Sequence, residues 1–300
     1  MFKACIIGSS GIILHHINAM LSNKIEVYSI CSTRKNSKNL IKFKKKYKNI
    51  KIFNNWKKCI EESSIVKNIF FLIAPRIDYT FKFVKYISKY KLPMLVEKPI
   101  SKNLSELNYL KKLNNYIFVG YNRIFFNNVI FLSKLNIKNS IISINCPEKN
   151  STSFLENSCH IISIILFLFK KITIIKKIKN KNYIFCSFKT KNNNIINLNI
   201  LFKTPTNFSI NIKSKGYEII MRPIEKLFFY NSLKIKKINN LYEYKQILKI
   251  KKNELKDKNK PGFINQYKEF KKSVMKKRMH KTANIFFANK VMHIAKNIIK

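Results

Sequence analysis

The stretch that decides the fold is Phe2–Ile13, with the sequence FKACIIGSSGII, near the beginning of the 300-residue chain. Its first half, Phe2–Ile7, is mostly apolar and predicts a buried strand. Gly8-Ser9-Ser10-Gly11 then forms a turn that opens a helix over Gly11–Leu21. A helix that starts directly after a buried strand can hold a pyrophosphate at its N-terminus, as in dinucleotide-binding folds. An ordinary strand-to-helix turn fits the same residues, so both interpretations stay open on this stretch alone.

The glycine turn departs from the usual dinucleotide fingerprint at two positions. Gly8 suits the tight turn, but Ser10 stands where a glycine lets the backbone approach the phosphates, and Ile13 where a glycine lets the helix pack closely on the strand. The Ser10 hydroxyl can still donate to a phosphate. We therefore predict that Gly8, Ser10, Gly11 and Ile12 bind the cofactor.

Strands and helices alternate over the first 120 residues. Predicted strands cover 2–7, 25–31, 51–53, 69–73, 94–96 and 116–119, and predicted helices cover 11–21, 37–47, 56–62, 77–90 and 104–113. The strands are apolar along most of their length, which is typical of a parallel sheet covered by helices on both faces. We predict a Rossmann-type, doubly wound α/β domain over residues 1–122.

The rhythm changes after about residue 140. An apolar helix over 159–169 is followed by β-like stretches with no helices between them, at 172–177, 183–188, 195–202, 208–213, 217–221 and 227–230. Strands that follow one another directly pair antiparallel. Helices over 263–275 and 282–299 close the chain. We predict an α+β domain with a mainly antiparallel sheet over residues 123–300, whose open sheet face is a natural surface for a homo-oligomer.

The net charge is +46, from 60 basic and 14 acidic residues, and would ordinarily indicate nucleic acid or an anionic membrane. Only five of the basic residues are arginine, the better fork for phosphates and base edges, and the charge is spread evenly along the chain. We interpret the excess of lysine as drift under an A/T-rich genome. We expect no specific nucleic acid and no membrane, and a soluble, cytoplasmic protein.

The cysteines give no metal or disulfide signal. They are six, scattered over the chain without a CxxC pair and without zinc-type spacing to histidine: Cys5, Cys31, Cys59, Cys146, Cys159 and Cys186. Scattered cysteines inside apolar runs are typical of free thiols in a reducing compartment.

Two motifs at strand ends carry chemistry. Cys31-Ser32-Thr33-Arg34 follows the second strand, where an acidic residue would bind the ribose of NAD; hydroxyls and an arginine suit the 2′-phosphate of NADP instead. We predict that Ser32, Thr33 and Arg34 bind the cofactor and favour NADP over NAD, although a lysine-rich surface loop would look the same. Val96-Glu97-Lys98-Pro99 ends a buried strand, where ligands of open α/β sheets bind. Lys98 there can polarise a substrate oxygen, or is a solvated lysine at a strand end.

At this point the chain resembles the glucose–fructose oxidoreductase/inositol dehydrogenase (Gfo/Idh/MocA) family. The motifs that carry the resemblance, in order, are Ile7-Gly8 with His16, Ala74-Pro75, Glu97-Lys98-Pro99, Gly120-Tyr121-Asn122-Arg123 with Phe125, and Glu156-Asn157-Ser158-Cys159-His160. Arg222–Leu227 and Lys260–Phe263 with Gln266 resemble the branch that works on surface polysaccharides and sugar nucleotides. The resemblance spans nearly the whole chain.

The resemblance implies a role for each matching residue. Lys98 contacts nicotinamide and the substrate hydroxyl, and His160 exchanges the hydroxyl proton while a hydride moves between a sugar or polyol carbon and NAD(P). The remaining matches are implied cofactor residues (Ala74, Pro75, Glu97, Asn122 and Arg123) and substrate residues (Glu156 and Asn157). His15, His280 and His293 match no catalytic position and are assigned to the surface or to packing.

The chain also departs from the family pattern. Glu156 stands where many members carry an aspartate, and Tyr79 stands near where many carry a histidine. Together with Ser10 and Ile13, these changes suit either an active oxidoreductase or a binding and scaffold protein that has kept the fold and lost catalysis. The two differ in whether Lys98 and His160 converge on one cleft beside the glycine turn.

Overall fold

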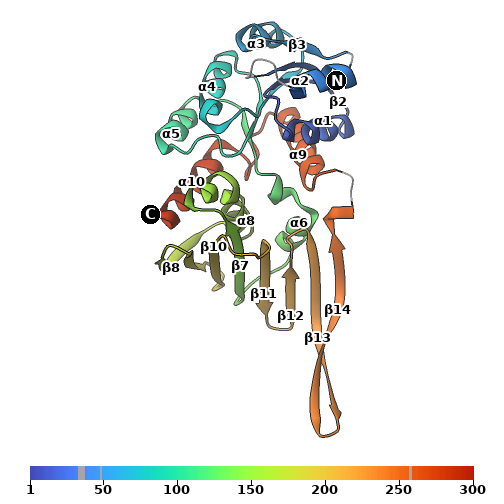
Figure 1. The fold of residues 1–300 in the computed structure, drawn as a ribbon, viewed down its shortest axis with the longest axis vertical. Coiled ribbons are helices and arrows are strands. Elements are labelled where there is room, and N and C mark those ends of the chain that lie inside the picture. The colour runs from blue at the N-terminus through green and yellow to red at the C-terminus, as the bar shows by residue number, and fades with distance from the viewer. Residues whose placement is uncertain (33–37, 48, 257–258) are drawn as a thin grey trace. The chain divides into compact units, whose positions relative to one another are not determined.

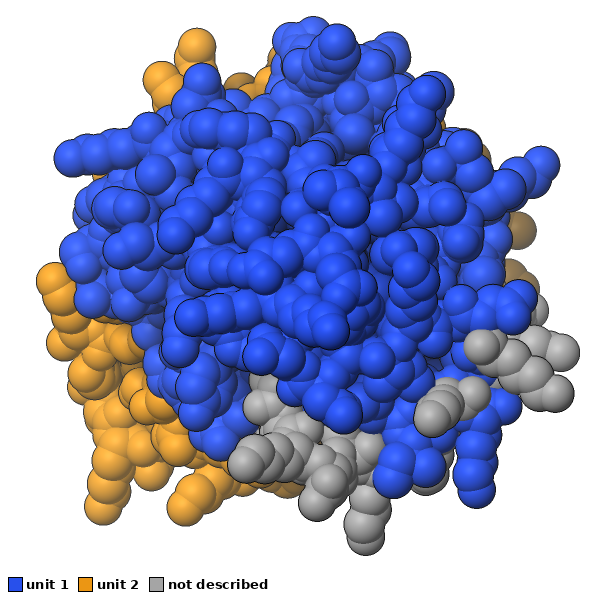
Figure 2. Space-filling view, turned by 90° about the horizontal axis from the view of Figure 1, so that it is seen from above, with its two compact units in different colours: residues 1–125, 262–293 blue, residues 126–261, 294–300 orange. Residues whose placement is uncertain are grey.

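The computed structural model describes residues 1–32, 38–47, 49–256 and 259–300, which divide into two compact units (Figure 2). The first unit comprises Met1–Phe125 and Gly262–His293, and the second comprises Phe126–Pro261 and Ile294–Lys300. The division after Phe125 falls close to the boundary expected from the sequence. The segment Gly262–His293 returns to the first unit, which the sequence rhythm does not indicate.

The first unit contains a six-stranded parallel sheet, in the order β3-β2-β1-β4-β5-β6 (Figure 1). Its strands are β1 (Phe2–Ile7), β2 (Ile25–Cys31), β3 (Lys51–Phe53), β4 (Ile69–Ile73), β5 (Met94–Glu97) and β6 (Ile117–Gly120). All neighbours pair in parallel, so the predicted Rossmann-type domain is confirmed. The strand order reverses between β1 and β4, and such a switch point opens a crevice at the carboxyl ends of the strands.

Two helices of the first unit begin at asparagine side chains that accept from their free amides. The helical segments are α1 (Ile12–Ser22), α2 (Lys38–Lys46), α3 (Trp56–Ser64), α4 (Ile77–Ile87), η1 (Ser88–Tyr90), α5 (Leu104–Lys112), η2 (Asn122–Phe125) and α9 (Phe263–Met275). The Asn55 side chain accepts from the amides of Lys57 and Lys58 at the start of α3, and Asn103 accepts from the Ser105 amide at the start of α5. Asparagine at this position stabilises a helix by about 1 kcal/mol over alanine.

The C-terminal part of the first unit packs against its beginning. Three aromatic side chains of α9, those of Phe263, Tyr267 and Phe270, are almost fully buried. The Asn23 amide donates to the Ile264 carbonyl over 3.1 Å, which ties the end of α1 to α9. Farther along, the Val119 amide donates to the Ala283 carbonyl over 2.7 Å and so extends the β6 edge of the sheet. These contacts explain why the segment belongs to the first unit.

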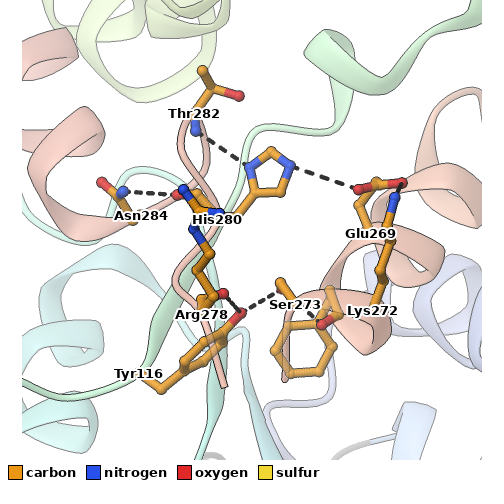
Figure 3. Close-up of polar contacts among 9 residues, drawn as sticks. Tyr116, Glu269, Lys272, Ser273, Arg278, His280, Thr282 and Asn284 are labelled. Atoms are coloured by element: carbon orange, nitrogen blue, oxygen red, sulfur yellow. Dashed lines mark hydrogen bonds and ion pairs between the residues drawn. The ribbon is translucent and has the colours of Figure 1, made fainter. Parts of the chain in front are cut away.

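His280 lies in the loop after α9, half-buried against the rings of Phe118 and Phe125 (Figure 3). Its Nδ1 accepts from the Thr282 amide over 3.3 Å, and its Nε2 lies 4.0 Å from the Glu269 carboxylate, which also pairs with Lys272. Nearby, Tyr116 donates to Ser273. Burial lowers the pKa of His280 below its ordinary value of 6.5, against the opposing charge of Glu269 and with the help of Lys272. The sequence-based assignment of this histidine to packing fits these contacts.

We expect His280 to make the protein less stable in mild acid. Because its pKa is lower in the folded chain, the stability from the neutral ring is complete above pH 6.5 and is lost as the pH falls from there through the folded-state pKa. His280→Asn keeps an acceptor near Nδ1 but cannot take up a proton. The measurement is the melting temperature at pH 7.5 and pH 5, which should fall less in the variant than in the wild type. An equal fall in both would contradict the assignment.

The second unit contains an eight-stranded sheet, in the order β14-β13-β12-β11-β7-β10-β9-β8. Its strands are β7 (Ile141–Glu148), β8 (Ile172–Lys179), β9 (Tyr183–Thr190), β10 (Ile195–Phe202), β11 (Ser209–Ser214), β12 (Tyr217–Met221), β13 (Lys226–Ile238) and β14 (Leu241–Asn253). β7 pairs with β10 in parallel and the other neighbours pair antiparallel. The predicted mainly antiparallel sheet is confirmed, with β7, β14 and the outer half of β13 added by the structure.

The sheet is apolar on one face and polar on the other. On β10, Ile196, Leu198 and Ile200 are fully buried, whereas the alternate residues Asn197 and Asn199 carry polar side chains on the opposite face. These amides bond across strands, to Ser187 over 2.8 Å and to Asn145 over 3.1 Å respectively. Alternation of this kind is expected where one face of a sheet packs on a core.

The second unit contains five helical segments in its described residues, of which α8 is the most buried. They are α6 (Asn127–Ser133), α7 (Ser151–Ser153), η3 (Phe154–Ser158), α8 (Cys159–Phe169) and η4 (Glu254–Lys256). The last helix, α10 (Ile285–Ile299), runs from the first unit into the second, which it enters at Ile294. The run Ser151–Phe169 has 19 residues with a mean hydropathy of 1.5, which is long and apolar enough to cross a membrane by length and composition. Because 61% of it is buried within the fold, it also fits the core helix that it forms here.

A long hairpin of β13 and β14 extends beyond the other strands of the second sheet (Figure 1). Residues 231–246, at its outer end, are exposed. Opposite residues pair Ile235 with Tyr244 on one face and Lys234 with Lys245 on the other, and each face carries both apolar and polar residues.

Candidate cofactor site and catalytic residues

Gly8 lies where the carboxyl ends of β1 and β4 meet, and only glycine fits there. Its φ is +134°, and a Cβ at this position would lie 2.4 Å from the Ala74 carbonyl oxygen. The Gly8 amide donates to the Cys31 carbonyl over 2.9 Å, and the Ala74 amide donates to the Ile7 carbonyl over 2.9 Å. These contacts bring the predicted residues Gly8 and Ala74 together at the switch point of the sheet.

The N-terminus of α1 has free space and an uncapped end. Gly11 begins the helix with no side-chain cap, and the first turn carries no acidic residue. A Cβ on Gly11 would meet nothing within 4 Å. Beside it Ser10 is exposed and Ile12 is half-buried. The Ile13 amide donates to the Ser10 carbonyl over 3.0 Å. An 11-residue helix whose N-terminus has no side-chain cap suits the phosphates of a dinucleotide, so the residues present fit such a group.

Ile13, which stands where the fingerprint has a glycine, packs in the hydrophobic core of the first unit. Its side chain is fully buried with those of Ile17 and Met20 on the inner face of α1. The interior of the unit thus accommodates a large residue at this position.

The loop after β2 is joined to the glycine turn. The hydroxyls of Ser9 and Ser32 lie 2.8 Å apart, and the Asn39 amide donates to the Ser9 carbonyl over 2.8 Å. The predicted cofactor residue Ser32 therefore lies beside the turn. Thr33 and Arg34, the rest of the predicted ribose contact, lie outside the described residues, and their role stays a prediction.

Glu97 is held by a buried histidine that was not among the predicted site residues. His16, on α1, is fully buried, with its Nε2 3.0 Å from Glu97 Oε1 and its Nδ1 2.9 Å from the Tyr267 hydroxyl. Burial, and then the charge of Glu97, raise the pKa of Tyr267 well above its ordinary value. Tyr267 therefore keeps its proton, and its hydroxyl and His16 Nδ1 form a buried hydrogen bond. His16 Nε2 and Glu97 Oε1 lie within ion-pair distance but form no aligned hydrogen bond. His16 could have been found from the sequence, because it is one of the residues that resemble the family pattern. Nothing in the sequence pointed to Tyr267.

Gly120 leaves room for the same carboxylate. A Cβ on Gly120 would lie 2.8 Å from Glu97 Oε1 and 3.3 Å from the Val96 carbonyl. Two motifs that lie apart in sequence, Glu97-Lys98-Pro99 and Gly120-Tyr121-Asn122-Arg123, thus meet at one side chain. Because the Glu97 carboxylate lies between His16 of α1 and Gly120 of β6, the peptide that carries the next residue, Lys98, is fixed in position.

The predicted first-unit residues share the carboxyl edge of the parallel sheet. Lys98 is half-buried directly after β5, and its bond to Pro99 is cis. Pro75 is half-buried after β4, while Asn122 (8% exposed) and Arg123 lie in η2 after β6. Tyr79, on α4, is 49% exposed. Parallel strands end at the same edge, so these residues lie on the side of the sheet where Gly8 ends β1.

His160 begins the apolar helix of the second unit. It is 6% exposed, and its carbonyl accepts from the Ser163 hydroxyl over 2.7 Å. The five residues before Cys159 form a π-helical turn that contains Glu156, which is half-buried, and Asn157, which is exposed. Ser158 of this turn donates to Glu148 on β7. Single π turns inside α-helices often occur at functional sites, because they shift side chains off the regular helical positions.

Lys98 belongs to the first unit and His160 to the second. Their convergence on one hydroxyl stays a prediction, as do the roles assigned to the individual site residues.

The two sheets together define the class of fold: a Rossmann-type unit with a mixed, mostly antiparallel second sheet is the architecture of the Gfo/Idh/MocA-type dehydrogenases. No protein-family model matches the chain, and no curated protein matches it in sequence. The resemblance therefore rests on solved structures, and it is confirmed for the fold.

Three solved structures illustrate this similarity. A dehydrogenase (MviM) from Clostridium difficile has a TM-score of 0.78 at 16% identity, covering 99% of this chain and 98% of its own. The UDP-N-acetylglucosamine 3-dehydrogenase GnnA from Acidithiobacillus ferrooxidans has a TM-score of 0.75 at 10% identity, covering 99% and 96%. An oxidoreductase from Agrobacterium radiobacter, solved with NAD+, has a TM-score of 0.71 at 11% identity, covering 98% and 94%. At such identities the similarity shows the fold.

Proposed function

We propose that this protein is an NAD(P)-dependent oxidoreductase that moves a hydride between a nicotinamide and a CH–OH group of a sugar, sugar nucleotide or related polyol. One observation carries the proposal: Gly8 approaches Ala74 beside the uncapped N-terminus of α1, at the switch point of the parallel sheet. That is the geometry in which a dinucleotide binds. Two proteins of similar fold support the proposed classes of substrate and cofactor. One is named as a UDP-N-acetylglucosamine 3-dehydrogenase, and the other was solved with NAD+.

In this proposal the residues of the first unit hold the cofactor. The backbone at Gly8, Gly11 and Ile12 and the Ser10 hydroxyl receive the pyrophosphate, and Ser32, Thr33 and Arg34 receive the ribose and its 2′-phosphate. Ala74, Pro75, Glu97, Asn122 and Arg123 border the nicotinamide half. When bound, the nicotinamide supplies the carbon that gives or takes the hydride.

The chain's own residues then handle the proton. Lys98 donates from its ammonium to the substrate oxygen and so stabilises the negative charge that grows there in oxidation. His160 takes the hydroxyl proton as the carbon loses its hydride, and returns it in the reverse direction. Imidazole suits this exchange because its unperturbed pKa lies near neutrality. Glu156 and Asn157 orient the substrate from the turn before His160.

The cofactor prediction is tested by fluorescence titration with NADPH and NADH. We expect NADPH to bind more tightly, and Arg34→Ala to remove the difference, because the guanidinium makes a charge-assisted contact to the 2′-phosphate worth about 1.5–3 kcal/mol, or roughly 10- to 150-fold in affinity. Arg222→Ala, which removes an exposed arginine of the second unit, is the matched control and should keep the preference. Equal affinity of the wild type for both cofactors would refute the role of Arg34. Binding of neither would overturn the proposed function.

Association of two copies through the polar face of the second sheet is expected alongside this function, and sedimentation of the purified protein tests it.

A further inference from the structure

The second unit contains a cavity at the end of the β13–β14 hairpin that joins the sheet, with a volume of about 730 Å³. Its lining comes from the start of α6 and from both strands: Asn127, Asn128, Lys226, Phe228, Lys251, Lys252, Asn253 and Glu254. A volume of this size is typical of small-molecule sites. All of its residues belong to the second unit, and none of them has a role in the proposed function.

Three lysines give the cavity a positive charge. Lys226, Lys251 and Lys252 all line it, and within the described part of the chain none of them forms a salt bridge with a carboxylate. The Lys251 ammonium lies 5.7 Å from the centre of the Phe228 ring. An anion with several acceptor oxygens, next to a flat or apolar group that covers Phe228, would satisfy this part of the lining.

Asn128, at the start of α6, is a buried residue of the cavity lining. Its side chain is fully buried, and its amide nitrogen donates to the carbonyls of Glu225 over 2.9 Å and Ile224 over 3.4 Å. This use of the nitrogen fixes the orientation of the amide. Its Oδ1 is buried and accepts from no donor among the described residues. A buried acceptor without a donor costs about 1–3 kcal/mol. Because Asn128 is 0% exposed, a ligand in the cavity contacts the other lining groups.

Glu254 is the carboxylate of the cavity. The Glu254 carboxylate accepts from the backbone N–H of Asn128 over 2.6 Å, and burial raises the pKa of Glu254. A carboxylate beside three ammonium groups makes the lining selective, because it accepts from hydroxyls and repels a second anionic group placed next to it. The lining therefore favours a ligand whose anionic group and hydroxyl groups lie in separate parts of the molecule.

We propose that this cavity binds a phosphorylated, hydroxyl-bearing small molecule. The phosphoryl oxygens lie against Lys226 and Lys251, hydroxyls donate to Glu254, and the ring of the ligand covers Phe228. A sugar phosphate and a nucleoside diphosphate share this chemistry. The site is additional to the glycine turn of the first unit.

Isothermal titration of the full-length protein at about 150 mM NaCl, without nicotinamide, tests the proposal with inorganic phosphate, glucose 6-phosphate and UDP as probes. We expect one of the two organic phosphates to bind more tightly than inorganic phosphate. The double variant Lys226→Ala/Lys251→Ala should weaken it at least tenfold, because two charge-assisted contacts are lost. Phe228→Ala should weaken UDP more than glucose 6-phosphate if the natural ligand is a nucleotide, and both equally if it is a sugar phosphate.

The matched control is Lys234→Ala/Lys236→Ala, which removes two exposed lysines from the outer half of the same strand. It should change the affinity less than twofold. Equal weakening by the cavity and hairpin variants would mean that the high net charge attracts phosphates without a site, and would overturn the proposal. So would inorganic phosphate binding as tightly as both organic probes, or no binding of any probe. None of these results depends on NADPH binding, so they are distinguishable from a failure of the proposed function.

Discussion

Replacing Lys98 by methionine or His160 by asparagine is expected to slow hydride transfer by about 10²–10⁴-fold, because proton transfer and charge stabilisation by positioned groups contribute that much. Binding of NADPH should change far less, since neither side chain contacts the phosphates in the proposed site. The measurement is single-turnover reduction of NADP+ with a panel of sugars, inositols and UDP-sugars, beside a fluorescence titration. A fall in the transfer rate with unchanged cofactor affinity is the signature of a group that acts in the chemical step.

The control for this prediction is Lys67→Met, which changes an exposed lysine in a turn of the same unit and should leave the rate unchanged. If both Lys98 and His160 variants transfer hydride within about threefold of the wild type, the catalytic assignment is wrong. If the wild type binds NADPH but oxidises nothing in the panel, the binding and scaffold alternative gains support.

Gly8→Ala is expected to have the largest effect on stability. A methyl group at this position would lie 2.4 Å from the Ala74 carbonyl oxygen, and the φ of +134° is one that side chains rarely adopt. Strain at such an angle costs of order 1–3 kcal/mol, and the clash with backbone between β1 and β4 adds to it, so we expect a loss of about 3 kcal/mol or more in the free energy of unfolding. Urea denaturation followed by circular dichroism measures it.

Gly11→Ala is the matched control, three residues along. A Cβ there meets nothing within 4 Å, and the φ of −57° is ordinary for a helix. This variant should unfold within about 0.5 kcal/mol of the wild type. It should nevertheless weaken NADPH binding, because its methyl group occupies the space in front of α1. Equal destabilisation by both substitutions would show that the close approach at Gly8 is not what requires glycine there.

Local patterns were enough to predict most of the fold. The apolar run of Phe2–Ile7 forms β1, and the alternating strands and helices that follow form the parallel sheet and its cover. The strands are recognisable because both of their faces are buried, so nearly all of their residues are apolar. Short-range motifs behaved in the same way. Gly8 was recognisable because it lies at the end of a buried strand, where the backbone geometry requires glycine. Lys98 also follows a buried strand, and its role stays a prediction.

Pairings between distant segments were beyond what those patterns can indicate. The sequence does not show that His16, Glu97 and Tyr267 form one buried chain, or that Gly120 must lack a side chain to make room for Glu97. Charged, exposed strands such as β14 were also missed, since their pattern reflects only hydrogen bonding to a neighbouring strand and not a core.

The chain therefore carries its class of fold in residues that act within a few positions of one another: buried strands, glycine at the tight turn, and a lysine at a strand end. Tertiary structure alone decides which segments share a unit, as with Gly262–His293 returning to the first sheet, and which polar groups are left without a donor, as with Asn128. The reason is physical. A helix or strand is selected by its own periodicity, whereas the partner of a buried polar atom is selected by whatever the rest of the chain brings beside it.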